Sequence, residues 1–421
     1  MKHENTTKKQ RTGLIAALDI GTTKVSCLIA RKDADRPARI VGIGHHASKG
    51  VKSGAIIDMD GAEHSIRSAV EAAELMAGEN IKSVTVGISG TCFSSRLVSY
   101  DISISGHEIN DNDIHRILDS HRLAVDIPED REIVHIIPVG YSIDGNRGVH
   151  DPRGMFGDRL GVNIHVITAS KNTIKNIHTC IHRCHLEIDD MVVAPYASAL
   201  SGLVGDEMRL GVTLIDMGGG TTNIAVFFDG EIVHTDSIPV GGINVTNDIA
   251  RGLSTPVAHA ERMKTLYGNA MPSPSDDHEI IKVPIIGEEQ SGEANPVPRS
   301  VLVGIIRPRI EETFEMVQQR LDGAGFGKVA GPRLVLSGGA SLLPGVREMA
   351  GEILQKQVRM ARPRAMDGLA EAASGPQFST CAGLLEYALK SGNAAMGRAW
   401  RPANRPASRF GRIGQWFREN F

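Results

Sequence analysis

The chain has 421 residues, of which 41% are hydrophobic and 23% charged; this length and composition exclude a single small module and wholesale disorder. Its 46 lysines and arginines nearly balance 49 acidic residues, and the resulting net charge of −3 excludes nucleic-acid binding driven by overall basicity. Five cysteines, few and odd in number, favour a reducing compartment over a disulfide framework.

The N-terminal segment imitates a secretory signal, because basic side chains in the polar stretch 1–12 precede an apolar run at 14–18. Asp19 ends this run before it reaches the roughly 7 to 15 apolar residues that a signal peptide needs. No stretch has the roughly 20 apolar residues that a membrane-spanning helix needs. We therefore expect a cytoplasmic protein with a disordered segment at 1–12.

One pattern occurs twice: a short apolar strand, an acid, a turn of Gly and Thr, and a second apolar strand. The first copy covers 14–30 with its acid at Asp19, and the second covers 212–228 with its acid at Asp216. Each copy is followed by a third strand-like run and then by a helical pattern. The runs lie at 40–43 and 231–238, and the helical patterns at 62–76 and 244–252. The repeat predicts two related α/β lobes.

The region between the two copies predicts a small α+β subdomain inserted at 84–165. Strands are expected at 84–88, 97–104, 133–139 and 164–168, with a helix at 111–123. A second insertion is expected to contain exposed loops at 271–298, which is rich in Pro, Ser, Asp and Glu. The stretch 391–407 has the composition of an unfolded linker.

A hairpin of acid, Gly and Thr can hold the phosphates of a nucleotide. Backbone N–H groups reach oxygens where Gly has no side chain, hydroxyls donate further hydrogen bonds, and the carboxylate can hold Mg²⁺ through waters. One such hairpin alone is weak evidence, since most are ordinary turns. Two hairpins, one in each half, predict a cleft that clamps one nucleotide from both sides. A third glycine pair, Gly338 and Gly339, follows a strand and precedes a helix, whose N-terminal amides favour an anion or nucleotide.

These motifs resemble the phosphate and adenosine motifs of the actin-like ATPase superfamily and, within it, the FtsA family of bacterial cell-division proteins. The motifs are Asp19-Ile-Gly-Thr-Thr, Asp216-Met-Gly-Gly-Gly-Thr-Thr and Ser337-Gly-Gly-Ala. The resemblance covers about 13–390 and the tail, including the segments 50–58, 86–90, 135–138, 151–155 and 342–346. It implies an α/β actin-like fold: duplicated RNase H-like ATPase lobes around a nucleotide cleft, an inserted α+β subdomain of the SHS2-like (1C) type, and a C-terminal amphipathic helix.

The resemblance also implies a division of the chain into subdomains. The first lobe (1A) would comprise 13–83, 166–207 and 363–390, with the insertion at 84–165. The second lobe would comprise 208–236 and 301–362 (2A) together with subdomain 2B at 237–300. A linker at 391–407 and a membrane-targeting helix at 408–421 would complete the chain.

The resemblance implies ATP and Mg²⁺ as ligands, with Asp19 and Asp216 flanking the ion through waters. The phosphate contacts would be Gly21, Thr22, Thr23, Gly218, Gly219, Gly220, Thr221 and Thr222. The ribose and adenine contacts would be Gly241, Gly242, Glu261 and Lys264, with Gly338 and Gly339 behind the adenine. An ordinary surface pair at i,i+3 is the alternative for Glu261 and Lys264. For Lys24 a simply solvated side chain is an open interpretation.

One position departs from the superfamily pattern. Many actin-like members place a Glu or Gln beside the Pro that precedes the small-residue helix entering the cleft, where it orients the attacking water. Here that position is Ala194, within 193–198, which contains no carboxylate or amide. Because phosphoryl transfer to water depends on positioning the nucleophile, we expect very slow hydrolysis and assign no catalytic residue.

The tail 405–421 predicts a basic amphipathic helix that lies on a membrane surface. At 100° per residue its apolar side chains form one stripe of about 80° with one flanking aromatic ring. The stripe consists of Phe410, Ile413, Phe417 and Phe421, the flanking ring is Trp416, and the accompanying basic residues are Arg409, Arg412 and Arg418. Such a helix beyond a linker is typical of an interfacial anchor for anionic lipid. A helix packed on the protein's own body is the alternative.

Taken together, the resemblance implies an adaptor that self-assembles and anchors the FtsZ ring to the cytoplasmic face of the inner membrane at the division site. FtsZ would be bound through about 240–300, and later division proteins through about 84–165. A metabolite or sugar kinase of the same superfamily is the alternative. It would need a catalytic Asp facing a substrate pocket, and it would not need the tail.

Overall fold

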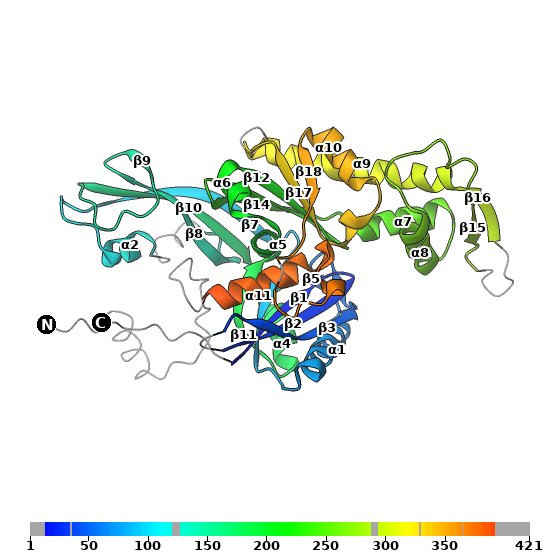
Figure 1. Cartoon of the computed structure of the whole chain (residues 1–421), viewed down its shortest axis with the longest axis horizontal. Coiled ribbons are helices and arrows are strands. Elements are labelled where there is room, and N and C mark those ends of the chain that lie inside the picture. Colours follow the sequence, from blue (N-terminus) through cyan, green and yellow to red (C-terminus); the bar gives the residue numbers. More distant parts are fainter. Residues whose placement is uncertain are drawn as a thin grey trace.

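A computed structural model describes residues 13–33, 36–119, 127–287, 294–327, 330–364 and 366–391. The expected disordered segment at 1–12, the linker beyond 391 and the tail helix, with every membrane-binding residue predicted in it, lie outside the described residues. Two lobes meet at the centre of the molecule, one subdomain extends to the left of the upper lobe and another to its right (Figure 1).

The first lobe is built on a five-stranded sheet in the order β11-β6-β1-β2-β3. Its strands are β1 (Gly13–Ile20), β2 (Lys24–Lys32), β3 (Arg39–Ala47), β6 (Ser83–Ile88) and β11 (Glu187–Val193). The first three are antiparallel, and β6 and β11 continue the sheet in parallel. Side chains alternate along β1, so Leu18 packs with α1 (Met59–Ala77) and Ala17 packs with α11 (Ser379–Ser391) on the opposite face.

The second lobe repeats this topology in the order β14-β13-β12-β17-β18. Its strands are β12 (Val212–Met217), β13 (Thr222–Phe228), β14 (Glu231–Ile238), β17 (Arg333–Ser337) and β18 (Gln357–Met360). Strands β12, β13 and β14 again pair in antiparallel fashion, and β17 and β18 extend the sheet with parallel pairing next to β12. Helices α9 (Arg299–Gly323) and α10 (Val346–Leu354) pack on this sheet around Phe314. The predicted duplication is therefore present strand for strand.

Two further units extend from the lobes (Figure 1). On the right lie α7 (Gly242–Gly252), α8 (Val257–Tyr267) and the antiparallel pair β15 (Ile280–Pro284) and β16 (Ala294–Pro298). On the left is an antiparallel sheet in the order β7-β10-β8-β9, accompanied by α2. Its elements are β7 (Phe93–Ser103), α2 (Asp111–Ile117), β8 (Arg131–Ile143), β9 (Asn146–Val149) and β10 (Arg159–Ser170).

The boundary of this left-hand insertion differs from the expectation. The strand expected at 84–88 is β6, and it pairs with β1 and β11 inside the first lobe rather than with the insertion. The apolar run carries no signal about which sheet it joins, so the sequence alone could not place it. The helix expected at 111–123 is α2, which ends at Ile117. Across the described ranges, no helix is both long and apolar enough to cross a bilayer.

Candidate functional site

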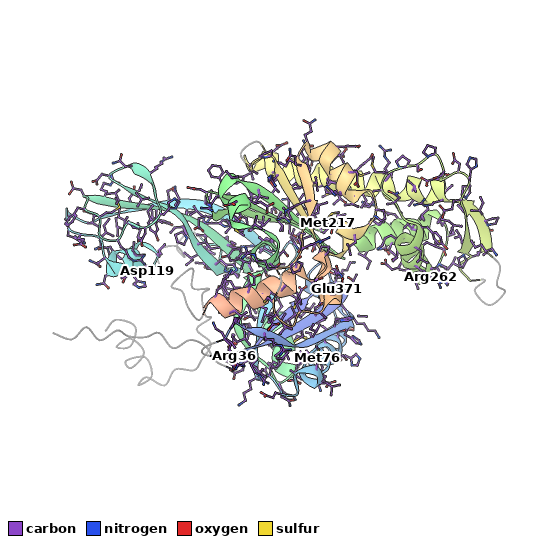
Figure 2. The ribbon with its side chains drawn as sticks, in the orientation of Figure 1. Arg36, Met76, Asp119, Met217, Arg262 and Glu371 are labelled. Atoms are coloured by element: carbon purple, nitrogen blue, oxygen red, sulfur yellow. The ribbon has the colours of Figure 1, made fainter. Side chains whose placement is uncertain are left out.

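A cleft of ≈ 390 Å³ lies between the two lobes, and Met217, one of its lining residues, marks their junction in Figure 2. The cleft brings together residues from both hairpins, from the start of α7, from α8 and from the loop after β17. Every predicted cofactor-binding residue lines it except Thr222. Thr222 is fully buried, and its hydroxyl donates to the carbonyl oxygen of Val240 at 2.8 Å, so its side chain supports the hairpin from behind.

The two hairpins face each other in direct contact. A Cβ placed on Gly219 would lie 2.5 Å from the side chain of Thr23, and one placed on Gly220 would lie 2.5 Å from the Thr22 hydroxyl oxygen. Real Cβ atoms do not approach other atoms this closely, so the absence of a side chain is what lets the lobes meet here. The two turns therefore border the same small space, although the N–H groups of Gly21 and Gly218 donate within their own turns, to the carbonyl oxygens of Lys24 and Thr221.

Asp19 at the end of β1 and Asp216 near the end of β12 form the acidic floor of the cleft. Loss of hydration, together with the negative charge of Asp216, raises the pKa of Asp19 to about 7. Burial also raises the pKa of Asp216, although hydrogen bonds from its neighbours oppose that shift. Two poorly hydrated carboxylates held near each other repel unless a cation lies between them, and oxygen donors of this kind fit Mg²⁺.

Two hydroxyls of the first lobe hold the acid of the second lobe. Asp216 Oδ2 accepts from Ser198 Oγ at 3.0 Å and from Thr380 Oγ1 at 3.2 Å, and the two hydroxyl oxygens are 2.8 Å apart. Ser198 lies on α5 (Ala194–Gly202) and Thr380 on α11. Sequence reasoning missed both, because hydroxyls on small-residue helices far apart in the chain carry no local signal of convergence.

Lys24 is a further residue that the sequence did not identify. Its Nζ donates to the carbonyl oxygen of Gln377 at 3.0 Å and lies 3.4 Å from the centroid of the Phe378 ring, a cation–π geometry. It lines the cleft, and burial lowers its pKa while Asp19 opposes the shift. This contradicts a simply solvated lysine and places a positive charge beside the hairpins.

Glu261 and Lys264 form more than a surface pair. Lys264 Nζ donates to Glu261 Oε2 at 2.7 Å, to Thr246 Oγ1 at 2.8 Å and to the Gly242 carbonyl oxygen at 3.1 Å. The Lys264 side chain is 15% exposed, against 54% for Glu261, so the lysine is the inner member of the pair. It ties α8 to the first turn of α7 on the cleft wall, which a solvated i,i+3 pair does not do.

Apolar side chains form part of the cleft wall beyond the turn at Gly338, which itself lies against the Asp216 carboxylate. Gly338 has a φ of +83°, and a Cβ there would lie 2.3 Å from the Met217 carbonyl oxygen, so the turn requires glycine. Ile310 and Leu343 join it in lining the cleft. A wall of this kind can accept the face of a planar ring while the hairpins hold charged groups at the other end.

Ala194 lies on the cleft wall, as expected from its place at the start of α5. Two amides, those of Asn223 and Gln377, are among the described lining residues, and neither lies on α5. Asn223 bonds to Asp216 and accepts from Ser237, and the amide of Gln377 packs over Gly375. Asn223 is therefore held by its neighbours, whereas Gln377 Oε1 is buried without a hydrogen-bond partner among the described residues.

The duplicated sheets and the cleft between them define a protein of the actin-like class. Two solved structures share this fold: a PilM–PilN type IV pilus biogenesis complex and the ADP-bound MreB5 of Spiroplasma citri. The first is 14% identical, covers 90% of this chain and 99% of its own with a TM-score of 0.65. The second is 14% identical, covers 90% and 98% with a TM-score of 0.54.

Comparison with curated families and proteins identifies the family. Residues 213–383 match the model of the cell division protein FtsA, and residues 90–168 match the SHS2 domain inserted in FtsA. The cell division protein FtsA of Rhizobium meliloti is 44% identical over 98% of this chain and 96% of its own length. The chain therefore belongs to the FtsA family of cell division proteins, which confirms the expected actin-like fold with an inserted SHS2 subdomain and disfavours the metabolite-kinase alternative.

Proposed function

We propose that this protein is an ATP-binding adaptor that assembles with copies of itself and anchors the FtsZ ring to the cytoplasmic face of the inner membrane. The main support for nucleotide binding is the pair of hairpins that face each other at the end of the cleft between the lobes. Gly219 and Gly220 of one hairpin pack against Thr23 and Thr22 of the other. Membership of a cell-division family supports the adaptor part.

ATP would lie along the cleft with its phosphates between the hairpins and its adenine against the apolar end. Backbone N–H groups around Gly21 and Gly219 would donate to phosphate oxygens, and Lys24 would supply positive charge. Lys264 and Gly242 would border the ribose, and Gly338 would lie behind the base. In this arrangement binding energy comes from both lobes at once, so the nucleotide favours the closed arrangement.

Asp19 and Asp216 would hold Mg²⁺ through its waters. A bound ion would neutralise phosphate charge and offset both the burial and the repulsion from Asp216 that raise the pKa of Asp19. Ser198 and Thr380 would keep the Asp216 carboxylate oriented during binding. Ionisation of both acids accompanies occupation of the site, so affinity for the ion rises with pH.

Hydrolysis would be slow, because the wall at Ala194 offers no group to orient the attacking water. We expect a turnover below about 1 s⁻¹, under the ordinary range for enzymes. ATP would then act mainly as a conformational and assembly ligand. A multiple-turnover phosphate-release assay with saturating ATP and Mg²⁺ measures this directly.

Partner binding is assigned by segment. The unit of α7, α8 and the β15–β16 pair, within 240–300, would contact FtsZ, and the insertion would recruit later division proteins. The basic aromatic tail at 408–421 would insert between anionic headgroups. The protein would thus be peripheral, at the cytoplasmic side of the inner membrane.

The experiment that tests the adaptor function is flotation on anionic liposomes with FtsZ, ATP and Mg²⁺ present. The full chain is expected to float and to carry FtsZ with it, whereas a chain ended at Arg405 stays at the bottom with its FtsZ. A full-length variant with Trp416→Ser and Phe417→Ser is the matched control, since it keeps every arginine of the tail. Failure of the full chain to float or to recruit FtsZ would contradict the proposal.

A further inference from the structure

Helices α5 and α11 pack against each other so closely that they form one unit. A Cβ placed on Gly383 of α11 would lie 1.7 Å from the carbonyl oxygen of Ala197 on α5. Ser201 Oγ adds a hydrogen bond to the Ser379 carbonyl oxygen at 2.7 Å. Because close-packed backbones cannot slide independently, a shift of one helix carries the other with it. In Figure 1, α11 lies between the two lobes.

One end of this helix pair reaches the cleft. Ser198 and Thr380 are both buried, and both hydroxyls donate to Asp216 Oδ2, which belongs to the second lobe. The hydroxyls are also within hydrogen-bond distance of each other at 2.8 Å. Any change in the position or charge of Asp216 therefore acts on α5 and α11 together.

The other end reaches the inserted subdomain. Tyr387 lies two helical turns after Thr380 and so on the same face of α11. Its ring and that of Tyr196 on α5 make edge contacts with the buried imidazole of His135, at centroid distances of 6.2 Å and 5.6 Å. His135 lies on β8 of the insertion, and its Nε2 accepts from the N–H of Val193 at 3.2 Å. Val193 directly precedes Ala194 of the cleft wall.

The insertion also contacts the second lobe. Ser95 on β7 and Thr235 on β14 exchange two hydrogen bonds: Ser95 Oγ donates to the Thr235 carbonyl oxygen at 2.8 Å, and the Thr235 N–H donates back at 3.1 Å. Three residues after Thr235, β14 ends, and the chain continues into Gly241 and Gly242 of the cleft. The insertion therefore contacts both lobes: in the first lobe it contacts Val193, just before α5, and in the second lobe it contacts β14. Both segments lead into the cleft.

We propose that Ser198 and Thr380 are positioning residues for Asp216, and that the α5–α11 pair transmits occupation of the cleft to the orientation of the inserted subdomain. This inference rests on the proposed nucleotide binding. If the lobes rotate when a nucleotide is bound, the insertion cannot keep both its His135 contact and its Ser95 contact unchanged, so it reorients. Thermodynamic linkage also works in the opposite direction. If the nucleotide changes the equilibrium of the His135 contact by some factor, then loss of that contact changes the affinity for the nucleotide by the same factor.

The test uses the full chain with spin labels on Asn146→Cys in the insertion and Glu71→Cys in α1, both exposed, in a Cys92→Ser, Cys184→Ser background. The distance between labels is measured by pulsed EPR without nucleotide, with ADP–Mg²⁺ and with ATP–Mg²⁺. We expect a nucleotide-dependent shift of several ångströms in the parent and in Thr380→Ser, which keeps the hydroxyl. We expect the shift to be lost in Thr380→Val, which has the same shape without the hydroxyl.

Nucleotide affinity supplies the second readout. His135→Phe keeps a ring but removes the acceptor for Val193, and we expect its dissociation constant for ATP to rise by about fivefold or more although no cleft residue has changed. The double variant His135→Phe, Thr380→Val should weaken binding by less than the product of the two single effects. Thr179→Val, on an exposed hydroxyl that donates only to the Lys175 carbonyl, is the control and should change neither readout.

The outcomes separate this inference from the function on which it rests. A parent chain that binds ATP but shows one label distance in all three states overturns the inference and leaves the proposed function intact. Independent, multiplicative effects of His135→Phe and Thr380→Val overturn it as well. A parent chain that binds no nucleotide overturns the proposed function and the inference together. If Thr380→Val folds poorly, the dissociation constant of His135→Phe for ATP still tests the inference.

Discussion

The hydroxyl of Thr22 lies opposite Gly220 across the cleft, so near that a Cβ on Gly220 would be 2.5 Å from Thr22 Oγ1. These residues belong to different lobes, in equivalent hairpins of the duplicated sheets. Their contact closes the end of the cleft that both turns border. It therefore provides a way to disturb closure without touching the acids or the apolar end.

Gly220→Ala should hold the hairpins apart and weaken ATP binding by about tenfold or more, which is about 1.4 kcal/mol. Titration with a fluorescent ATP analogue measures the dissociation constant. The melting temperature should change little, because the added methyl group projects into the cleft rather than into a lobe's core. Gly304→Ala is the matched control: a Cβ there meets nothing within 4 Å on the exposed side of α9, and the substitution should leave affinity unchanged. Equal affinities of Gly220→Ala and the parent would contradict the phosphate-cradle role of this contact.

The paired acids predict an unusual pH dependence for the nucleotide-free protein. The pKa of Asp19 is raised from 3.8 to about 7, so the folded state binds a proton that the unfolded state has released at intermediate pH. Stability from this group is fully present below about pH 4 and falls as pH rises toward 7. Asp19→Asn removes this carboxyl group. At pH 8 the free energy of unfolding of the variant should therefore exceed that of the parent by on the order of 1–3 kcal/mol.

Denaturant unfolding of the nucleotide-free proteins at pH 5 and pH 8 measures this difference. The gain in the free energy of unfolding of Asp19→Asn should be smaller at pH 5 than at pH 8. In a separate binding measurement, the affinity of the variant for ATP should no longer depend on Mg²⁺. Asp322→Asn, on the exposed end of α9, is the control for removing one charge. A less stable Asp19→Asn at pH 8 would contradict the cost of burying the ionised Asp19 carboxylate beside Asp216.

The duplicated fold could be predicted because its signals are local. Each hairpin joins neighbouring strands through a short turn, as when Leu18 pairs with Cys27, so the apolar runs and the Gly/Thr turn suffice to place both strands. The second hairpin follows the same rule, with Asp216 opposite Asn223. The equivalent positions of the two acids on their strands could therefore be predicted from the sequence.

The rest depends on contacts between distant segments. Ser198 and Thr380 meet at Asp216 although 182 residues separate them, and neither helix carries a pattern that distinguishes these hydroxyls from ordinary ones. The placement of β6 in the first lobe depends on pairing with β11, about 100 residues later in the chain. Lys24 looked solvated because its partners, Gln377 and Phe378, come from the far end of the chain.

The Lys264 ammonium group, which ties α8 to α7, predicts a specific loss of affinity. Lys264→Met keeps the aliphatic stem but removes three hydrogen bonds, to Gly242, Thr246 and Glu261. We expect ATP affinity to fall by about tenfold, since the first turn of α7 loses its fixed position on the cleft wall. Isothermal titration calorimetry measures the change, with Lys282→Met on the exposed face of β15 as the control. Parallel losses in both variants would point to general electrostatics instead of this tether.

The wall at Ala194 predicts a gain of function. Ala194 stands at the first turn of α5 and lines the cleft, and its own side chain has no group that could orient water. Ala194→Gln would add an amide at the position where the resemblance to actin-like proteins implies a water-orienting group, and we expect the single-turnover rate of ATP hydrolysis to rise by about tenfold or more. Ala194→Leu, of similar bulk without an amide, should not exceed the parent rate. If both variants hydrolyse ATP at the parent rate while binding it normally, then slow turnover has another cause, such as incomplete closure of the two hairpins around the phosphates.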